Sequence, residues 1–130
     1  MAIKFAYTIL YVRDVLASIA FYEKAFDLKR RFIAPDNSYG ELETGESTLS
    51  FASTALAKSN LKDGFTESDP GNKPFGIEIG FTTADVEQTL NAAVNAGGVQ
   101  VAEPKTKPWG QVVAYVRDPD GFLVEICTPM

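Results

Sequence analysis

The chain has 130 residues, enough for one domain with a hydrophobic core and too few for two ordinary domains. It carries 17 acidic and 12 basic residues, and no basic run tracks phosphates, so nucleic acid and membrane surfaces are excluded as partners. Histidine is absent, which excludes histidine-dependent catalysis and histidine metal ligands. The single cysteine, Cys127, precludes an intrachain disulfide.

The remaining composition is that of an ordinary globular protein, with 45% apolar residues. No apolar run reaches the ~20 residues that span a bilayer, and the first residues lead into a strand pattern rather than a signal peptide. We therefore expect a soluble, cytoplasmic protein. The net charge of −5 slightly favours a cationic or neutral ligand.

The first half of the chain predicts one helix among four strands. Residues 3–12 are rich in β-branched and aromatic residues, which is typical of a strand. Asp14 is a candidate N-cap for a helix over residues 15–26. Apolar side chains recur at helical spacing in this segment, at Val15, Ile19, Tyr22 and Phe26. Three more strands are predicted at 28–33, 39–43 and 48–52.

The second half repeats this order after a polar segment over residues 54–73. We expect a connecting loop there, with a short helix over residues 55–61; loops of this length are lids, ligand-contacting segments or plain connections. A strand follows at 75–82, and then a helix that is capped by Thr83 and ended by Gly97-Gly98. Three strands are predicted after the helix, at 99–102, 109–116 and 122–128.

The element order is thus β-α-β-β-β in both halves, at about residues 1–53 and 74–130. We predict a single α+β domain in which two βαβββ repeats form a curved mixed sheet around a cleft, with the helices outside.

The last two strands are joined by Asp118-Pro119-Asp120-Gly121, which is a turn sequence with a physical basis. Proline presets φ for the second turn residue, and glycine supplies the positive φ that closes the turn. Glu125 follows, and period-two alternation places it on the opposite face from Val124 and Ile126. That face either meets water or lines a cavity. Arg117, at a strand end, is expected to be solvated.

This duplicated pattern resembles the glyoxalase/bleomycin-resistance/extradiol-dioxygenase superfamily, also called the vicinal oxygen chelate fold. The resemblance covers essentially the whole chain. Two groups of residues carry it: Asp14, Ser18, Phe21-Tyr22 and Phe26 in the first half, and Trp109-Gly110, the Asp118–Gly121 turn and Glu125-Ile126 in the second.

In metalloenzymes of that family, one residue from each of four strands holds a divalent metal, usually His or Glu. The resemblance transfers these positions to Tyr7, Ser50, Gly76 and Glu125. Only Glu125 is an ordinary ligand, whereas such metals need three or four converging nitrogen, oxygen or sulfur donors. We therefore expect no metal in this site and no cofactor.

Further candidate ligand-binding residues follow from strand parity and side-chain chemistry. Glu78 shares the parity of Gly76 and lies either on the same wall as Glu125 or at an exposed sheet edge. Two such carboxylates can bind an amine or guanidinium, or act as an acid–base pair. Aromatic side chains, which also fill ordinary cores, can stack on planar or cationic ligands: Tyr7, Tyr11, Trp109, Tyr115 and Phe65. Gly76 and Gly80 have no side chains, so they leave space on their face of the strand for a ligand or for a bulky neighbour across the sheet.

Three functions are compatible with this pattern. The leading hypothesis is a metal-independent small-molecule-binding protein of the bleomycin-resistance type that sequesters an antibiotic or toxic metabolite in a homodimer, as the resemblance implies. The alternative is a lyase, isomerase or dioxygenase with an atypical site, in which Glu125 or Glu78 acts as general base. A third is an interaction or sensor domain.

Overall fold

The computed structural model describes all 130 residues and divides them into two compact units. The first contains Met1–Glu23 and Asp27–Glu67, and the second contains Lys24–Phe26 and Ser68–Met130. The boundary at Glu67 falls inside the segment that we predicted to connect the two repeats. None of the helices combines the length and the apolar character that crossing a membrane requires.

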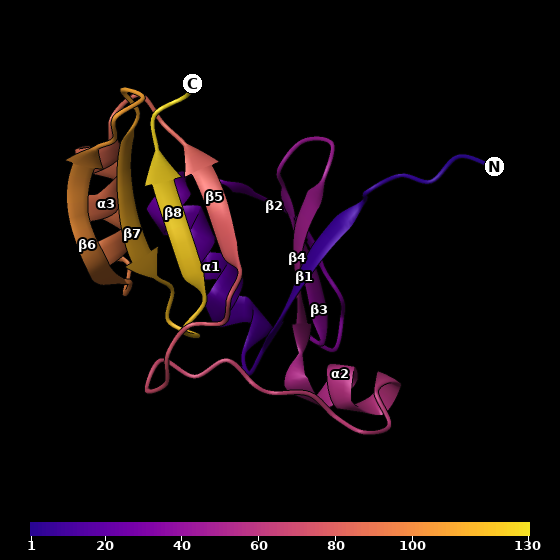
Figure 1. The fold of residues 1–130 in the computed structure, drawn as a ribbon. Coiled ribbons are helices and arrows are strands. Elements are labelled where there is room, and N and C mark those ends of the chain that lie inside the picture. The colour runs from indigo at the N-terminus through magenta and orange to yellow at the C-terminus, as the bar shows by residue number, and fades with distance from the viewer. The chain divides into compact units, whose positions relative to one another are not determined.

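The first unit is built on a four-stranded mixed sheet, sheet 1 (Figure 1). Its strands, in the order β1-β4-β3-β2, are β1 (Tyr7–Val12), β4 (Thr48–Ser53), β3 (Tyr39–Glu43) and β2 (Lys29–Ile33). β1 and β4 are parallel, and the other pairs are antiparallel. The helices α1 (Val15–Phe26) and α2 (Thr54–Asn60) complete the order, and α2 confirms the short helix predicted near 55–61.

Helix α1 forms for the reasons visible in its sequence. The side chain of Asp14 accepts a hydrogen bond from Ala17 N at 3.1 Å and so caps the helix. Ile19 and Tyr22 are fully buried, and the Tyr22 ring lies 5.4 Å from the ring of Phe51 on β4. Helix α1 therefore covers the face of sheet 1 that carries Phe51.

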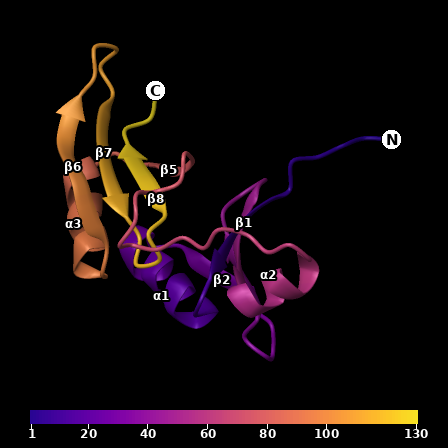
Figure 2. The ribbon, with the colours of Figure 1, turned by 60° about the horizontal axis from the view of Figure 1, so that its bottom comes forward.

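The second unit repeats this plan with sheet 2, in the order β5-β8-β7-β6. These strands are β5 (Glu78–Thr82), β8 (Leu123–Cys127), β7 (Val112–Arg117) and β6 (Val99–Thr106). β5 and β8 are parallel, and α3 (Val86–Asn95) packs against β6, β7 and β8 (Figure 2). The predicted βαβββ repeat and fold class are confirmed. Hydrogen bonding divides the strands into two sheets, because no ladder joins β1 to β5.

Two local predictions were wrong. The cap of α3 is Asp85, whose side chain accepts from Gln88 N at 3.0 Å, while the Thr83 hydroxyl accepts from Asp85 N. Arg117 is not solvated. Its guanidinium donates to the backbone carbonyls of Asp69, Pro70, Asn72 and Gly121. These hydrogen bonds hold the 69–72 segment against the turn before β8.

Candidate ligand-binding site

The clearest cluster of titratable groups lies on the face of sheet 2 that α3 does not cover. Val116, Val124 and Ile126 are fully buried, and their neighbours in sequence point to the other side. That other side, which we name the acidic face, carries Glu78, Gly80, Tyr115, Glu125 and Cys127. The sequence expectation that Glu125 leaves the apolar face is met, since Glu125 is only half-buried.

Strand register brings the polar groups of the acidic face together. Glu125 lies opposite Gly80 on β5 and opposite Tyr115 on β7. The Tyr115 hydroxyl donates a hydrogen bond to Glu125 Oε1 at 2.9 Å. The carboxyl of Glu78 on the neighbouring strand lies close enough to that of Glu125 for each acid to shift the pKa of the other. Three groups from three strands thus converge.

The environment moves the pKa values of the two acids in opposite directions. Partial desolvation, together with the hydrogen bond and charge of Glu125, raises the pKa of Glu78. Desolvation also acts on Glu125, but hydrogen bonds from its neighbours and the positive charge of Lys107 outweigh it and lower the pKa of Glu125. The hydrogen bond to Glu125 and burial raise the pKa of Tyr115 to about 12. The pair can therefore hold one proton on the Glu78 side.

The predicted site residues of the second half are only partly gathered. A Cβ added at Gly80 would meet nothing within 4 Å, which leaves open space directly beside Glu125. Gly76 also has open space but precedes β5, so Glu78 rather than Gly76 is the β5 neighbour of Glu125. Trp109 is 61% exposed in the β6–β7 turn, where its Nε1 donates to Gln111 Oε1 at 2.9 Å.

The predicted residues of the first half lie on sheet 1, on the face opposite α1, which we name the polar face. Tyr7 is 51% exposed, and the ring of Tyr11 meets that of Phe65 edge-on at 4.8 Å. Ser50 is fully buried, and its Oγ has no hydrogen-bond partner. Tyr7 and Ser50 both lie close enough to Tyr39 to act on its pKa, whereas the ring of Tyr11 contacts Phe65.

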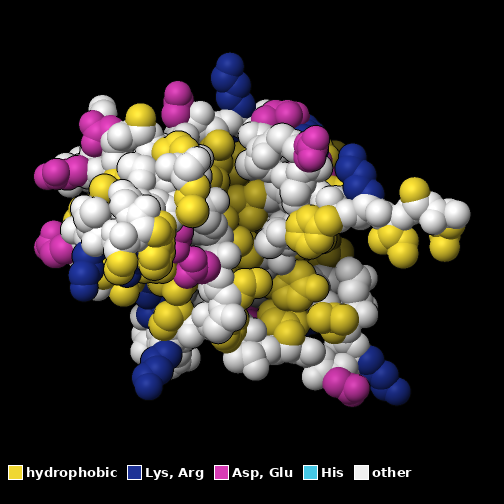
Figure 3. All heavy atoms as spheres, turned by 45° about the horizontal axis from the view of Figure 1, so that its top comes forward, with side chains coloured by type: hydrophobic (Ala, Val, Ile, Leu, Met, Phe, Trp, Pro, Cys, Tyr) yellow, Lys and Arg dark blue, Asp and Glu magenta, His cyan; other side chains and the backbone are white.

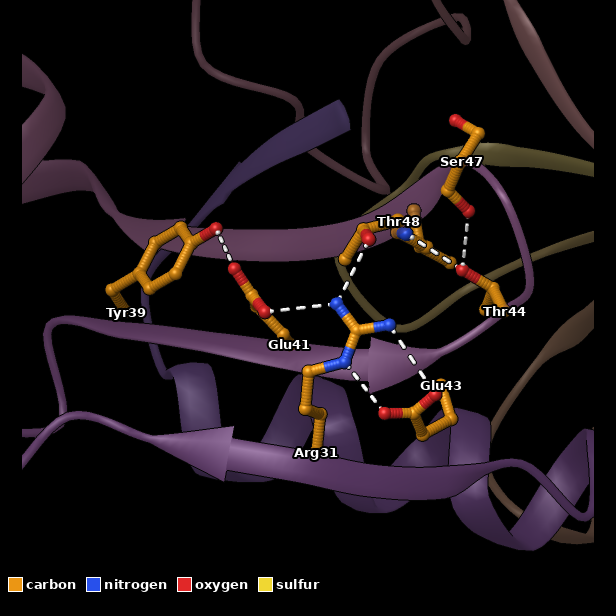
Figure 4. A network of polar contacts seen from close by, with 8 residues as sticks. Arg31, Tyr39, Glu41, Glu43, Thr44, Ser47 and Thr48 are labelled. Atoms are coloured by element: carbon orange, nitrogen blue, oxygen red, sulfur yellow. Dashed lines mark hydrogen bonds and ion pairs between the residues drawn. The ribbon is translucent and has the colours of Figure 1, made fainter. Parts of the chain in front are cut away.

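Sequence reasoning missed the main polar network of sheet 1, which centres on Arg31 (Figure 4). The Arg31 guanidinium donates to Glu43 Oε1 at 2.6 Å, Glu41 Oε1 at 3.2 Å and Thr48 Oγ1 at 3.0 Å. The Tyr39 hydroxyl donates to Glu41 Oε2 at 2.7 Å. Alternation of polar residues at 39, 41 and 43 was a signal for this face. Arg31 could not be predicted as the partner of these residues, because a β-bulge on β2 interrupts the alternation and turns Arg31 toward β3.

The donor set does not fit a divalent metal. No group of three or more His, Cys, Asp or Glu side chains is arranged to hold one. At the family's ligand positions, Ser50 offers a buried hydroxyl and Tyr7 a phenol, so neither replaces a carboxylate or an imidazole. On the acidic face, the two carboxyl groups of Glu78 and Glu125 do not supply the three or four ligands that a metal needs.

With this geometry in view, comparison with known proteins places the chain in a family. The profile of the Glyoxalase/Bleomycin resistance protein/Dioxygenase superfamily matches residues 4–126, and the chain belongs to this superfamily.

Individual relatives are more distant. A putative lactoylglutathione lyase from Brassica oleracea var. gemmifera is 30% identical over 128 residues, 95% of this chain and 43% of that protein. The chain therefore spans less than half the length of this curated relative.

Solved structures support the fold. A glyoxalase-related enzyme from Fulvimarina pelagi superposes with a TM-score of 0.81 at 22% identity, over 95% of this chain and 86% of that chain. A glyoxalase/bleomycin resistance protein/dioxygenase family enzyme from Burkholderia phytofirmans PsJN gives 0.80 at 21% identity, over 98% of this chain and 100% of that chain. At these identities the similarity establishes the architecture alone.

Proposed function

We propose that this chain is a metal-independent small-molecule-binding protein of the glyoxalase/bleomycin-resistance type. Its acidic face takes a ligand that presents an amine, a guanidinium or another strong hydrogen-bond donor. The observation that carries this proposal is the Glu78–Glu125 carboxyl pair, to which no basic side chain forms an ion pair.

Two neighbouring carboxyl groups repel each other when both are ionised. Desolvation is the largest cause of the raised pKa of Glu78, and the hydrogen bond and charge of Glu125 add to it. A cationic ligand group beside the two acids would offset their repulsion. The open space at Gly80 is where such a group can approach Glu125.

The biological form of this function that we favour is sequestration of an antibiotic or a toxic metabolite. Cationic aromatic compounds suit the chemistry, because the carboxyl pair takes the charge and the half-buried Tyr115 ring offers an aromatic surface beside it. Bleomycin-type glycopeptides are one class to test, and cationic aromatic metabolites are another.

Isothermal titration calorimetry with matched cationic and neutral aromatic compounds tests the proposal. We expect cationic members to bind at least about tenfold more tightly, a difference of ~1.4 kcal/mol. The double variant Glu78→Gln/Glu125→Gln should lose that preference. Glu46→Gln, which removes an exposed acid far along the sequence, should keep it. Absence of binding across the panel, bleomycin included, would rule out the drug-binding form.

A second candidate is a glyoxalase-type lyase or isomerase with Glu125 as general base. The opposite pKa shifts of Glu78 and Glu125 favour it, because they separate a proton holder from a proton acceptor. The similarity to a putative lactoylglutathione lyase points the same way. A dioxygenase form has less support, since the donors do not fit a metal.

Turnover of methylglyoxal with glutathione, measured with and without a chelator, tests this candidate. Activity that survives the chelator and is lost in Glu125→Gln would favour catalysis by the acid pair. A rate equal to the uncatalysed background would remove the glyoxalase form of this candidate.

We also propose a homodimer. Apolar side chains alternate along the N-terminal stretch and β1 and are exposed: Ile3, Phe5, Tyr7 and Ile9 (Figure 3, N-terminal end at right). β1 is an edge strand, and exposed apolar edges commonly pair with another chain. Native mass spectrometry should report twice the mass of the chain, together with any retained ligand. A monomer at micromolar concentration would contradict the dimer.

A further inference from the structure

Arg117, the last residue of β7, uses every donor of its guanidinium on the main chain. A guanidinium carries five N–H groups, and Arg117 makes five hydrogen bonds of 2.6–3.2 Å to backbone carbonyls. Two go to Gly121, in the turn before β8. The other three go to residues 69–72, within the stretch 68–75 that we name the lead-in segment. One side chain thus joins two segments that are far apart in sequence.

The two segments that Arg117 joins lead directly into a pair of parallel strands. The turn with Gly121 runs into β8, and the lead-in segment runs into β5. The first residues of these strands, Glu78 and Leu123, are partners in the ladder. Because both strands start from the same guanidinium, the length of chain between it and each strand decides which residues of β5 and β8 meet.

Further contacts hold the lead-in segment against the same turn. The Ser68 hydroxyl donates to the carbonyl of Asp120 at 2.8 Å. The rings of Phe75 and Phe122 meet edge-on, with their centroids 6.2 Å apart. At Gly121, an added Cβ would lie only 2.8 Å from backbone atoms of the lead-in segment. The lead-in segment is therefore packed as well as hydrogen-bonded in place.

The strand β5 specifies its own register only weakly at the end where it begins. It is an edge strand of five residues that pairs only with β8. Glu78 and Gly80 are exposed, and Ile79 is half-buried. The Phe81 ring stacks on that of Phe26 at 4.4 Å, which holds the far end of the strand. A shift of one residue at the near end would turn Glu78 away from the acidic face.

We propose that Arg117 is a positioning residue for the acidic face: it sets the register between β5 and β8 and so presents Glu78 beside Glu125. The consequence for binding rests on the proposed function, in which the two acids recognise a cationic group. Arg117 acts through Glu78, since its own N–H groups are all engaged. Lysine cannot replace it fully, because an ammonium has three donors and no planar fork.

The test is a titration of the Glu78 carboxyl, followed by 13C NMR of the full chain. Desolvation, together with the hydrogen bond and charge of Glu125, raises the pKa of Glu78, and these causes require Glu78 to lie beside Glu125. In Arg117→Met, we expect the pKa of Glu78 to return toward its ordinary value of 4.5. Arg30→Met, which removes an exposed guanidinium from β2, should leave it unchanged. An unchanged pKa of Glu78 in folded Arg117→Met would overturn the proposal.

A pair of insertions tests the same role with Arg117 in place. One glycine inserted after Lys73 lengthens the chain between the part held by Arg117 and β5, whereas one inserted after Lys62 lengthens it before that part. Both positions are exposed. The first insertion should lower the pKa of Glu78 and weaken the nuclear Overhauser effects between β5 and β8, and the second should change neither. Equal effects of the two insertions would contradict the positioning role.

Ligand binding separates this role from the proposed function. In Arg117→Met, the preference of about tenfold for cationic over neutral aromatic compounds should disappear, and Arg117→Lys should recover only part of it. If the unmodified chain shows no such preference, the proposed function fails, while the Glu78 titration still decides the role of Arg117. A preference retained in full by Arg117→Met would overturn that role.

Discussion

The two sheets have equivalent strand orders and the same pattern of parallel and antiparallel pairs. The surroundings of their acidic residues nevertheless shift the pKa values of these residues in opposite directions. On sheet 1, the hydrogen bond from Arg31 lowers the pKa of Glu43, and the same guanidinium bonds Glu41. On sheet 2, desolvation and the neighbouring Glu125 raise the pKa of Glu78. Sheet 1 places an arginine in direct contact with its acids, whereas on sheet 2 Lys107 acts on Glu125 through its charge without forming an ion pair.

This difference is consistent with a structural role for the acids of sheet 1 and a ligand-binding role for those of sheet 2. Acids that are neutralised by a fixed arginine within the protein are poor sites for an external cation. Acids that share only a proton remain available for a ligand, and their unfavourable proximity is a feature common at functional sites. This contrast is the basis for proposing that sheet 2, rather than sheet 1, recognises a cationic ligand.

The largest expected loss of stability follows from replacing a turn glycine, and a turn glycine in the other repeat provides the comparison. Gly121→Ala should destabilise the protein by ~3 kcal/mol or more, because φ is +94° and the new Cβ would lie 2.8 Å from Asp69 C and Pro70 N. Gly45→Ala has φ +92° but open space, so it should cost only ~1 kcal/mol. Urea unfolding measures both. Equal losses would mean that the 69–72 segment is not held against the turn.

Removing the cation of sheet 1 should have the next largest effect. Arg31→Met leaves Glu41, which is almost fully buried, without its compensating charge, and should lower the melting temperature by several degrees. The loss should be smaller when Glu41 is already Gln. Lys29→Met on the same strand is the control, because Lys29 is exposed. Scanning calorimetry of the four variants gives the comparison, and an equal loss in Lys29→Met would contradict it.

A smaller and matched effect is expected for one tyrosine in each sheet. Tyr39→Phe and Tyr115→Phe each remove a hydrogen bond to a carboxylate and should cost ~1 kcal/mol at neutral pH. Burial and Glu41 raise the pKa of Tyr39 to about 12, and Tyr115 also reaches about 12.

The pH dependence of these variants follows from the sign of the shift. A raised phenol pKa contributes stability that is complete below its ordinary value near 10 and is lost as pH rises through about 12. Urea midpoints measured from pH 9 to 12 should therefore fall less steeply in either variant than in the unmodified chain. Parallel curves would mean that the phenols are not bonded to carboxylates.

The smallest effect concerns the acid pair itself. Glu78→Gln should stabilise the protein at pH 7 by less than ~1 kcal/mol, since the residue is exposed and its repulsion is screened. The raised pKa of Glu78 means that its favourable contribution exists below the ordinary value of 4.5 and is lost as pH rises. The gain should therefore disappear toward pH 4.

Glu125→Gln should behave in the opposite sense. The lowered pKa of Glu125 contributes stability above the ordinary value, which is lost as pH falls through the folded-state pKa. The variant should thus be destabilised at neutral pH and equal the unmodified chain in acid. Glu103→Gln, an exposed acid on β6, should show neither trend in thermal melts at matched pH. Stabilisation by both Glu78→Gln and Glu125→Gln would contradict the assigned roles.

Features that depend on residues close together in the chain could be predicted from the sequence alone. Alternation of apolar and polar residues predicted the strands and placed Glu125 opposite Val124 and Ile126. Helical spacing and Asp14 predicted α1, and the Asp118–Gly121 segment predicted a turn with positive φ at Gly121. Duplication of these patterns was enough to predict two βαβββ repeats. These patterns involve residues close together in the chain, so they can be recognised without knowledge of the fold.

Contacts between side chains on different strands could not be predicted in this way. Parity could place Glu78 and Gly76 on one face, but the parallel β5–β8 register brought Gly80 opposite Glu125 and Glu78 within its reach. A β-bulge, which alternation cannot reveal, turned Arg31 toward Glu41. Such contacts depend on the register of strands distant in sequence, which residue patterns alone do not specify.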